Sequence, residues 1–376
     1  MWIERFYEEN FEKLLNPGKV LVVHGMRRTG KTSLIKKFLN SYKGKYFFGT
    51  GEDLFLKEIL ESQNVQRITS AFGEYDLVVI DEAQYIFNVG LGLKILVDHN
   101  PHIKIIATGS SSFDLSNKLG EPLTGRQKVI QLYPIAVMEL KKQFGSLEIR
   151  KNLNDLLIFG SFPEVLQMQS PNDRIEYLHS LRNSYLLKDL LILENLRNAN
   201  KLIDLLRLIA FQIGKEVSLN ELSNSLDLSK QTVFRYLDLL EKVFIIKKIG
   251  GFSRNLRKEI TKSNRYYFWD NGLRNAIINN FNYLENRNDT GMLWENFALI
   301  ERLKRNSYRK HFANYYFWRT YDRQEIDFIE EYNGELHGYE FKWSNKSVKA
   351  PKIWMETYKN THFEIVNKEN FIDFVG

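Results

Sequence analysis

Three predominantly apolar runs in the first third of the chain predict buried strands. They cover residues 20–23, 75–80 and 103–108, and a stretch typical of a helix, 33–39, follows the first. Continuous β-branched runs are characteristic of parallel strands buried on both faces of a sheet. The pattern therefore predicts an α/β core with helices packed on either side.

Between residues 218 and 240 the pattern changes to two short helices. Ser218 opens the first, Ser229 caps the second, and apolar residues in the second recur at helical spacing: Val233, Tyr236, Leu237 and Leu240. An apolar strand predicted over 243–246 completes a winged helix-turn-helix, whose exposed side chains toward a DNA groove would be Lys230, Gln231 and Arg235. The alternative is a lid or a protein-contact surface.

Two alternating runs near the carboxyl end, 324–329 and 336–343, are joined across Asn333-Gly334, which predicts a β-hairpin. If these two residues form the turn, Tyr332 pairs with Glu335. The same register places Asp327 opposite Glu340 and Glu325 opposite Lys342 on one face. The other face would carry apolar side chains: Ile326, Phe328, Tyr339 and Phe341.

The loop after the first strand fills the phosphate-binding (Walker A) pattern GxxxxGKT over residues 25–32. Glycines at Gly25 and Gly30 let successive backbone N–H groups face an anion at a helix N-terminus. Lys31 would reach the β- and γ-phosphates of ATP, and the hydroxyl of Thr32 would ligate Mg²⁺. The residues expected to surround the nucleotide are Gly25, Arg27, Arg28, Thr29, Gly30, Lys31, Thr32 and Ser33.

Polar residues also follow the other two predicted strands. Asp81 fits the carboxylate that holds Mg²⁺, and Glu82 fits the base that polarises the attacking water. Ser110, after the third strand, is the candidate sensor of the γ-phosphate or of the water; a helix N-cap is the alternative role. The set predicts hydrolysis in addition to binding.

The predicted hairpin contains a second candidate site. Two facing carboxylates, Asp327 and Glu340, repel each other unless a divalent cation, Mg²⁺ or Mn²⁺, bridges them. Lys342 would then lie near the attacking water or the scissile phosphate. This arrangement resembles the core of PD-(D/E)XK nucleases, in which Glu295, on a helix predicted from residue 291, resembles the helical glutamate; Glu301 is its rival. The alternative is an ordinary hairpin with a Glu325–Lys342 salt bridge.

The chain resembles the bacterial and archaeal predicted AAA+-type P-loop ATPases with a conserved C-terminal domain of unknown function. The resemblance rests on these motifs: 25–32, 81–84, 108–111, 123–126, 132–134, 160–164, 270–273 and 340–342. It implies that Arg126 acts as an arginine finger in trans on a neighbouring subunit's γ-phosphate. It also implies that Pro163, in the lid, packs near the adenine.

Composition agrees with a multi-domain enzyme. The chain has 376 residues, of which 43% are hydrophobic and none is cysteine, so disulfides and thiol chemistry are excluded. No apolar run approaches the roughly 20 residues of a membrane span, so we expect a cytoplasmic protein with no membrane partner.

The net charge of +7 favours a polyanionic partner. The basic residues in segments 254–265 and 302–310, with Arg319 and Arg323, are candidates for phosphate contact. The aromatic runs 266–269 and 315–318 are expected to be core strands, base stacking being the alternative.

We therefore expect an α/β fold in four parts. These are a P-loop AAA+-like parallel-sheet core over 1–145, a helical lid over 146–200, a winged helix-turn-helix over 201–252 and a PD-(D/E)XK nuclease-like domain over 253–376. The leading functional hypothesis is an oligomeric ATPase acting on nucleic acid, DNA rather than RNA, with cleavage in the C-terminal domain. The alternative is a nucleotide-dependent switch or scaffold that binds DNA or a partner protein and cuts nothing.

Overall fold

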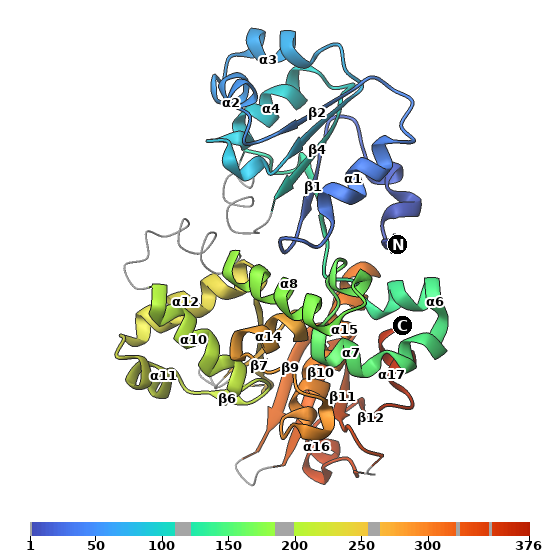
Figure 1. Cartoon of the computed structure of the whole chain (residues 1–376), viewed down its shortest axis with the longest axis vertical. Coiled ribbons are helices and arrows are strands. Elements are labelled where there is room, and N and C mark those ends of the chain that lie inside the picture. Colours follow the sequence, from blue (N-terminus) through green and yellow to red (C-terminus); the bar gives the residue numbers. More distant parts are fainter. Residues whose placement is uncertain (1, 110–121, 185–198, 255–263, 321–323, 346–347) are drawn as a thin grey trace. The chain divides into compact units, whose positions relative to one another are not determined.

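The computed structural model describes residues 2–109, 122–184, 199–254, 264–320, 324–345 and 348–376. The chain forms two compact units, which are described separately (Figure 1). The first comprises residues 4–133 with 242–244, and the second comprises residues 134–241 and 245–376 with the first three residues of the chain.

The first unit is built on five parallel strands in the order β2-β3-β4-β1-β5. The strands are β1 (Val20–His24), β2 (Tyr46–Thr50), β3 (Leu77–Asp81), β4 (Lys104–Gly109) and β5 (Gln127–Gln131). Its helices are α1 (Lys31–Leu39), α2 (Leu54–Glu61), α3 (Val65–Phe72) and α4 (Val89–His99). The predicted α/β core with a parallel sheet is confirmed.

This sheet is buried on both faces, as the apolar runs predict. Along β3, Val78 packs into the cluster that contains residues of α2, α3 and α4, and Val79 packs into the cluster that contains residues of α1. Figure 1 shows α2, α3 and α4 gathered on one side of the sheet. Alternate residues of a strand point to opposite faces, so a strand covered on both sides must be apolar throughout.

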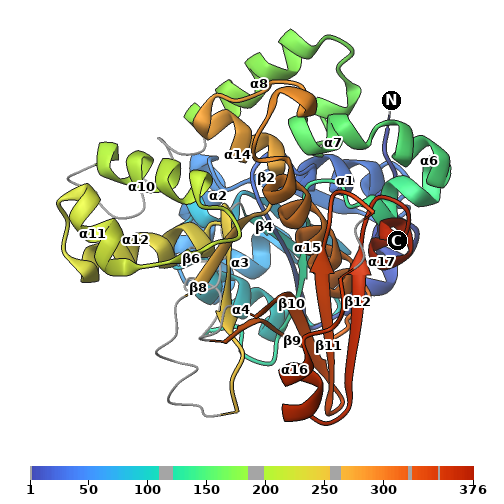
Figure 2. The same ribbon diagram turned by 90° about the horizontal axis from the view of Figure 1, so that it is seen from below.

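The second unit contains a mixed seven-stranded sheet in the order β12-β11-β10-β9-β7-β8-β6 (Figure 2). Its strands are β6 (Glu216–Val217), β7 (Ile246–Gly251), β8 (Asn264–Phe268), β9 (Asn314–Arg319), β10 (Glu325–Tyr332), β11 (Glu335–Phe341) and β12 (Thr361–Val366). Strand pairs β11/β12 and β7/β9 are parallel, and the others are antiparallel. The aromatic runs predicted as core strands lie in or adjoin β8 and β9, where Tyr267 and Phe317 are buried.

The helices of the second unit precede the sheet, lie between its strands or follow its last strand. They are α6 (Val137–Lys151), α7 (Leu153–Phe159), α8 (Pro171–Ser184), α10 (Ala199–Phe211), α11 (Leu219–Leu226), α12 (Lys230–Lys242), α14 (Asn271–Ile278), α15 (Thr290–Tyr308), α16 (Lys352–Thr357) and α17 (Phe371–Val375). The helix predicted from residue 291 is therefore α15.

The helix-turn-helix is present as α11 and α12. Ser218 accepts a hydrogen bond from the backbone N–H of Glu221, and Ser229 accepts one from that of Thr232. The four predicted core residues of α12 are buried. The strand predicted over 243–246 is wrong, because Phe244 has a φ of 60°, in the left-handed region, and β7 begins only at Ile246.

β7 also connects the helix-turn-helix to the carboxyl-terminal strands. Its last residues, Gly250 and Gly251, pair with Tyr316 and Phe317 of β9. The predicted domain limit at residue 252 thus directly follows a strand that pairs with residues on the other side of that limit. The division into four domains stays a prediction, whereas the sheet that β6–β12 share is observed.

The hairpin register is confirmed, since Tyr332 pairs with Glu335 and Phe328 with Tyr339. A bulge against β9 interrupts β10 between Ile326 and Ile329. Ile326 consequently packs in the cluster with Ile329 and Trp354, not with the stacked rings of Phe328, Tyr339 and Phe341. The prediction that Ile326 shares a face with these rings is wrong, because a bulge reverses the alternation of side chains.

Candidate nucleotide site and carboxylate cluster

The candidate nucleotide loop connects the end of β1 to the start of α1. Gly25 has a φ of 150°, and a Cβ on it would lie 2.0 Å from the carbonyl oxygen of Leu132. Gly30 has a φ of 91° and directly precedes α1. Glycine at both positions therefore permits the tight loop that the phosphate-binding pattern predicts.

A buried arginine, Arg5, holds the backbone of this loop through hydrogen bonds. Arg5 donates to the carbonyl oxygen of Thr29 and, over 2.7 Å, to that of Tyr133. The hydroxyl of Thr29 donates to the carbonyl of Met26 over 2.8 Å. Sequence reasoning missed Arg5, because it lies outside the motif and no local pattern distinguishes it from a surface residue.

Lys31 lies inside the loop. Its ammonium donates to the carbonyl oxygens of Gly25 (3.0 Å) and Met26 (2.9 Å), and the residue is only 4% exposed. Burial, together with the charge of Lys31, lowers the pKa of His24 to about 4. His24 is therefore neutral at pH 7, so it adds no charge to that of the lysine.

Two hydroxyl groups connect Asp81 to the loop and to the backbone of Glu82. Thr32 donates to Asp81 Oδ2 over 2.8 Å, and Thr108 donates to Asp81 Oδ1. Thr108 also accepts from the backbone N–H of Glu82 over 2.9 Å. Neighbouring ligands of an octahedral Mg²⁺ with bonds of 2.0–2.1 Å lie about 2.9 Å apart. The oxygen atoms of Thr32 and Asp81 thus fit two ligands of one Mg²⁺.

Glu82 turns out of the strand with a φ of 50°, and its carboxylate accepts from the side-chain amide of Gln84. Ser110 lies outside the described residues. Thr108 is the hydroxyl that the structure places between the two acidic residues, and sequence reasoning missed this role. Its position at the end of an apolar strand was the available signal, but a β-branched residue there is typical of core packing.

The other predicted nucleotide contacts lie around the loop. Arg27 donates to the hydroxyl of Tyr85 over 2.7 Å. Arg28 and Ser33 are exposed. Pro163 lies in the second unit, after α7, and its contact with adenine stays a prediction.

Arg126 lies at the other end of the sheet from the loop. Its carbonyl accepts from the N–H of Val20, the first residue of β1, whereas the loop follows the last residue of β1. Five residues of strand separate the two ends, about 17 Å. The guanidinium of Arg126 is paired with Asp98 over 2.7 Å. This position is compatible with the predicted role in trans, which stays a prediction.

The second unit gathers the three predicted metal-binding carboxylates: Glu295 of α15, Asp327 of β10 and Glu340 of β11. Burial, with the like charge of Glu340, raises the pKa of Asp327 to about 7. Burial, with the like charge of Asp327, also raises the pKa of Glu295. Glu295 accepts from the hydroxyl of Tyr267 over 2.8 Å, and Asp327 accepts from the N–H of Phe341 over 2.9 Å.

Arg265 of β8 supplies positive charge to this cluster. Its guanidinium lies 3.0 Å from Glu325, 3.7 Å from Asp327 and 3.9 Å from Glu295. The residue is 4% exposed and paired with carboxylates, so the prediction that Arg265 contacts phosphate from an exposed basic segment is wrong. Sequence reasoning missed Arg265 as a member of the cluster, because β8 reaches it only through tertiary folding.

The salt bridge between Glu325 and Lys342, which belonged to the alternative interpretation of the hairpin, is also wrong. Glu325 pairs with Arg265, and Lys342 pairs with Glu340 over 2.6 Å. Burial by itself would lower the pKa of Lys342, but the bond to Glu340 raises it, so the lysine is charged at neutral pH.

Glu301 is not the rival of Glu295. It pairs with Lys304 over 2.6 Å and accepts from the N–H of Val137 over 2.6 Å. Glu295 and Glu301 are six residues apart in α15, about 1.7 turns, so their side chains point to different sides of the helix and meet different neighbours.

One carboxylate oxygen of the cluster has no hydrogen-bond donor in the described residues and could therefore accept a cation. Within the described part of the chain, Glu340 Oε2 is buried and accepts no hydrogen bond. A buried carboxylate oxygen without a donor is costly unless another ligand satisfies it. The residues present therefore fit a divalent metal, although Arg265 already offsets part of their charge.

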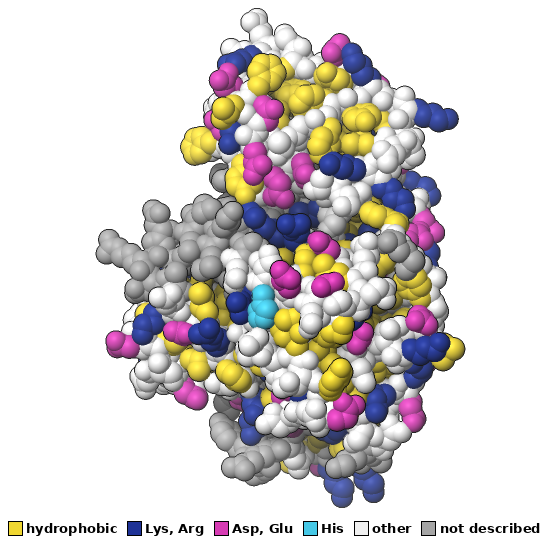
Figure 3. Space-filling model, in the orientation of Figure 1, with side chains coloured by type: hydrophobic (Ala, Val, Ile, Leu, Met, Phe, Trp, Pro, Cys, Tyr) yellow, Lys and Arg dark blue, Asp and Glu magenta, His cyan; other side chains and the backbone are white. Residues whose placement is uncertain are grey.

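The two predicted basic segments do not form a continuous basic surface in the described chain. Arg302 pairs with Glu330 over 2.8 Å, and Lys304 is buried against Glu301. Arg319 pairs with Glu216, while residues 255–263 and Arg323 lie outside the described residues. On the face in Figure 3, basic and acidic side chains are interspersed. In contrast, the predicted groove-facing residues of α12 are all exposed: Lys230, Gln231 and Arg235.

Within the described ranges, no helix is both long enough and apolar enough to pass through a lipid bilayer.

Comparison with known proteins identifies three successive regions. Residues 17–141 match the family described as AAA domain. Residues 150–284 match a domain of unknown function (DUF8612), and residues 290–371 match another (DUF4143).

Similar proteins include the uncharacterized protein MJ1544 of Methanocaldococcus jannaschii, which is 25% identical across 97% of this chain and 89% of its own length. The uncharacterized protein Rv2008c of Mycobacterium tuberculosis is 26% identical across 88% of this chain and 71% of its own.

Among solved structures, AMPPCP-bound DnaA from Aquifex aeolicus matches 62% of this chain and 84% of its own, with 16% identity and a TM-score of 0.28. A signal transduction ATPase with numerous domains from Pyrococcus horikoshii matches 81% of this chain and 45% of its own, with 14% identity and a TM-score of 0.31.

From the family matches, the chain carries an ATP-binding AAA domain followed by two domains of unknown function.

Proposed function

We propose that the protein is an ATPase whose hydrolytic cycle acts on a nucleic acid held by the second unit. The observation that carries the hydrolytic part is the chain of hydrogen bonds from Thr32 through Asp81 and Thr108 to the backbone of Glu82. It connects the loop expected to hold the phosphates to the residue expected to activate water.

Each residue has a defined role in this proposal. The backbone N–H groups of the loop and the ammonium of Lys31 bind the phosphates, after Lys31 gives up its bonds to Gly25 and Met26. Mg²⁺ held by Thr32 and Asp81 would neutralise charge on the phosphates. Glu82 accepts a proton from the attacking water, and Gln84 orients its carboxylate. Arg126 of a neighbouring subunit completes the site.

ATP hydrolysis by wild-type protein and three variants tests this proposal. Lys31→Ala should lose at least about a hundredfold in kcat/KM, because it removes charge from the transition state. Glu82→Gln should bind ATP with wild-type affinity but not hydrolyse it. Lys36→Ala, an exposed lysine of the same helix, is the matched control and should retain activity. Equal rates in wild type and Lys31→Ala would refute the assignment.

A second activity, metal-dependent cleavage of DNA, is supported by the carboxylate cluster. Asp327, Glu340 and Glu295 supply the oxygen ligands that Mg²⁺ or Mn²⁺ requires, and Glu340 Oε2 has no donor within the described chain. Lys342 donates a hydrogen bond to Glu340, so its positive charge lies beside the proposed metal ligands. In this proposal that charge contacts the scissile phosphate. The bound metal would supply a Lewis acid and a nucleophilic water.

The cleavage assay uses single-stranded, duplex and branched DNA, and single-stranded RNA, with Mn²⁺ in the presence and absence of ATP. Asp327→Asn and Lys342→Met should abolish cutting while ATP hydrolysis remains. Glu331→Gln, on the same hairpin, is the matched control. Binding of nucleic acid without cutting in wild type would favour the switch or scaffold, and neither binding nor cutting would favour a partner protein.

A further inference from the structure

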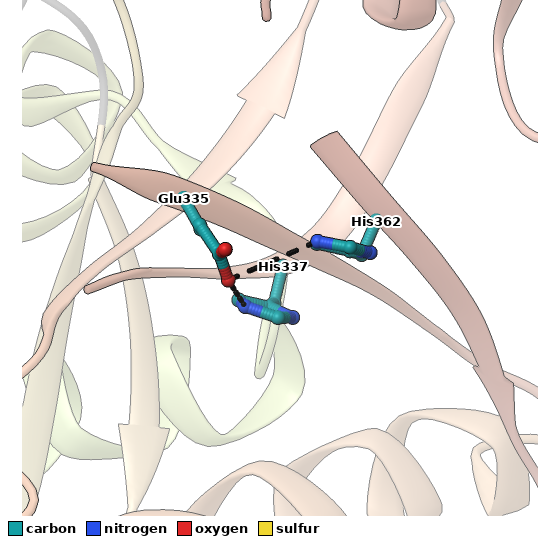
Figure 4. A group of neighbouring side chains, drawn as sticks. All are labelled: Glu335, His337 and His362. Carbon is teal, nitrogen blue, oxygen red and sulfur yellow. Dashed lines mark hydrogen bonds and ion pairs between the residues drawn. The ribbon is translucent and has the colours of Figure 1, made fainter. Parts of the chain in front are cut away.

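Three potential metal ligands converge near the turn of the β10–β11 hairpin, apart from the two sites above. Glu335 and His337 are two residues apart in β11, and His362 in the parallel neighbour β12 pairs directly with His337 (Figure 4). Because residues i and i+2 of a strand share a face, adjacent strands bring these side chains together.

The ligand atoms are already close. Glu335 Oε2 lies 3.2 Å from His337 Nε2 and 3.8 Å from His362 Nε2, and the three residues offer ligand atoms that all lie within 4.8 Å of one another. The two imidazole rings are stacked, with centroids 4.6 Å apart and planes 13° apart. Ligands of a tetrahedral metal with bonds of 2.0–2.1 Å lie about 3.4 Å apart. Small side-chain rotations therefore suffice to place all three around one cation.

We propose that Glu335, His337 and His362 bind a divalent transition-metal cation, with Zn²⁺ as the best match. Two imidazoles and one carboxylate are ligands that Zn²⁺ prefers, whereas Mg²⁺ requires octahedral oxygen coordination. The side chains are 52%, 34% and 57% exposed, respectively, so the cation can enter from solvent. Water completes the tetrahedron.

This site is separate from the carboxylate cluster. His337 and Glu340 are three residues apart in β11, about 10 Å along the strand. An odd spacing in a strand directs the two side chains to opposite faces, and β11 pairs with β12 without a bulge from Leu336 to Phe341. One cation cannot be shared between them.

Binding has a structural consequence. β12 is the edge strand of the seven-stranded sheet and pairs with β11. A cation ligated from both strands adds a cross-link between them, so it stabilises the folded edge of the sheet.

Calorimetric titration of the full chain, purified without a histidine tag, with Zn²⁺ tests the proposal. Wild type should bind one Zn²⁺ at these residues. His337→Gln and His362→Gln should each weaken that binding at least about a hundredfold, and Glu335→Gln at least about tenfold, since each removes a direct ligand. His102→Gln, which changes an exposed histidine of the first unit, is the control and should retain binding. Asp327→Asn removes a proposed ligand of the carboxylate cluster and so distinguishes the two sites: the Zn²⁺ held by Glu335, His337 and His362 should remain.

Two further measurements use the same proteins. Co²⁺ in place of Zn²⁺ should give the intense visible absorption of a tetrahedral site in wild type and not in the histidine variants. If a variant fails to fold, zinc should still protect His337 and His362 of wild type from acylation by diethyl pyrocarbonate.

Three results would overturn the proposal: no Zn²⁺ binding by wild type, unchanged binding in both histidine variants, or loss of binding only in Asp327→Asn. The last would place the cation in the carboxylate cluster. None of them bears on ATP hydrolysis, which is measured without Zn²⁺.

Discussion

Thr108 occupies a central position among single residues of the nucleotide site. It is fully buried, donates to Asp81 and accepts from the backbone of Glu82. A hydroxyl can make both bonds at once, because it carries one donor and two acceptor lone pairs. Thr108 therefore holds Asp81, the proposed metal ligand, and Glu82, the proposed water-activating residue, in one fixed relation.

Replacing Thr108 by valine should lower kcat for ATP hydrolysis about 10–100-fold, with a much smaller change in KM. Valine has nearly the same shape as threonine, but it removes one donor to Asp81 and leaves the N–H of Glu82 without an acceptor. Thr108→Ser keeps the hydroxyl and should retain most of the activity. Steady-state kinetics at saturating Mg²⁺ measure both; equal kcat values in the two variants would contradict this role.

His24 gives the first unit a pH dependence of stability. Its pKa is lowered to about 4 in the folded state, chiefly by burial. In an unfolded chain, histidine titrates near 6.5, so between about 6.5 and about 4 the unfolded state binds more protons. The stability contributed by neutral His24 is complete above pH about 6.5 and is lost as the pH falls toward about 4.

Urea unfolding of wild type and His24→Gln across that range should reveal this contribution. The free energy of unfolding of wild type should fall more steeply on acidification, by about 1–3 kcal/mol over the range. Carboxylates titrate in both proteins, so the difference between the two curves isolates His24. Parallel curves would contradict the lowered pKa.

At the scale of elements, α12 exposes both basic and aromatic side chains on its outer side. Its buried side packs through residues such as Val233 and Leu240, and its outer side exposes Lys230 and Arg235. The same outer side exposes 54% of Phe234. Charge favours a phosphate backbone, whereas an exposed aromatic ring favours a protein partner.

The two partners predict different variants. If α12 binds DNA, Lys230→Ala combined with Arg235→Ala should reduce the slope of log affinity against log salt by about 2, and Lys43→Ala, which changes an exposed lysine of the first unit, should leave it unchanged. If α12 binds protein, Phe234→Ala should weaken the contact and salt should matter little. Fluorescence anisotropy with labelled duplex DNA over a range of salt concentrations makes the measurement.

At the scale of the whole molecule, the role proposed for Arg126 connects ATP hydrolysis to assembly. Arg126 lies about 17 Å from the loop of its own sheet, the length of a five-residue strand. An arginine finger contributes about 10³–10⁵ to kcat, but only where it reaches the γ-phosphate. A role for Arg126 in hydrolysis therefore requires a second subunit.

Mixing two inactive variants tests this arrangement. Lys31→Ala lacks a functional loop and Arg126→Ala lacks the finger, so each alone should be inactive. A mixed assembly pairs an intact loop with an intact arginine, and activity should return as the two are combined. Asp98→Asn, which removes the salt-bridge partner of Arg126, is the control and should remain active. No recovery from a mixture shown to co-assemble would rule out the role in trans.

The parts of the fold that sequence predicted are those set by local pattern. The apolar runs around Val22 and Val79 gave the parallel sheet, helical spacing in α12 gave the helix-turn-helix, and Asn333-Gly334 gave the hairpin register. Predictions failed where a local irregularity intervened. The left-handed backbone of Phe244 delays β7, and the bulge after Ile326 reverses the alternation in β10.

Sequence by itself determined the nucleotide loop, because a contiguous motif encodes both its glycine conformations and its chemical groups. Tertiary structure alone decided which distant residues join it: Arg5 behind the loop, Thr108 between the acids, and Arg265 among the carboxylates. Strand pairing likewise decided that His362 meets His337. Local spacing fixes where a side chain points within its own element, whereas contacts between elements depend on packing across the whole chain, which no short pattern encodes.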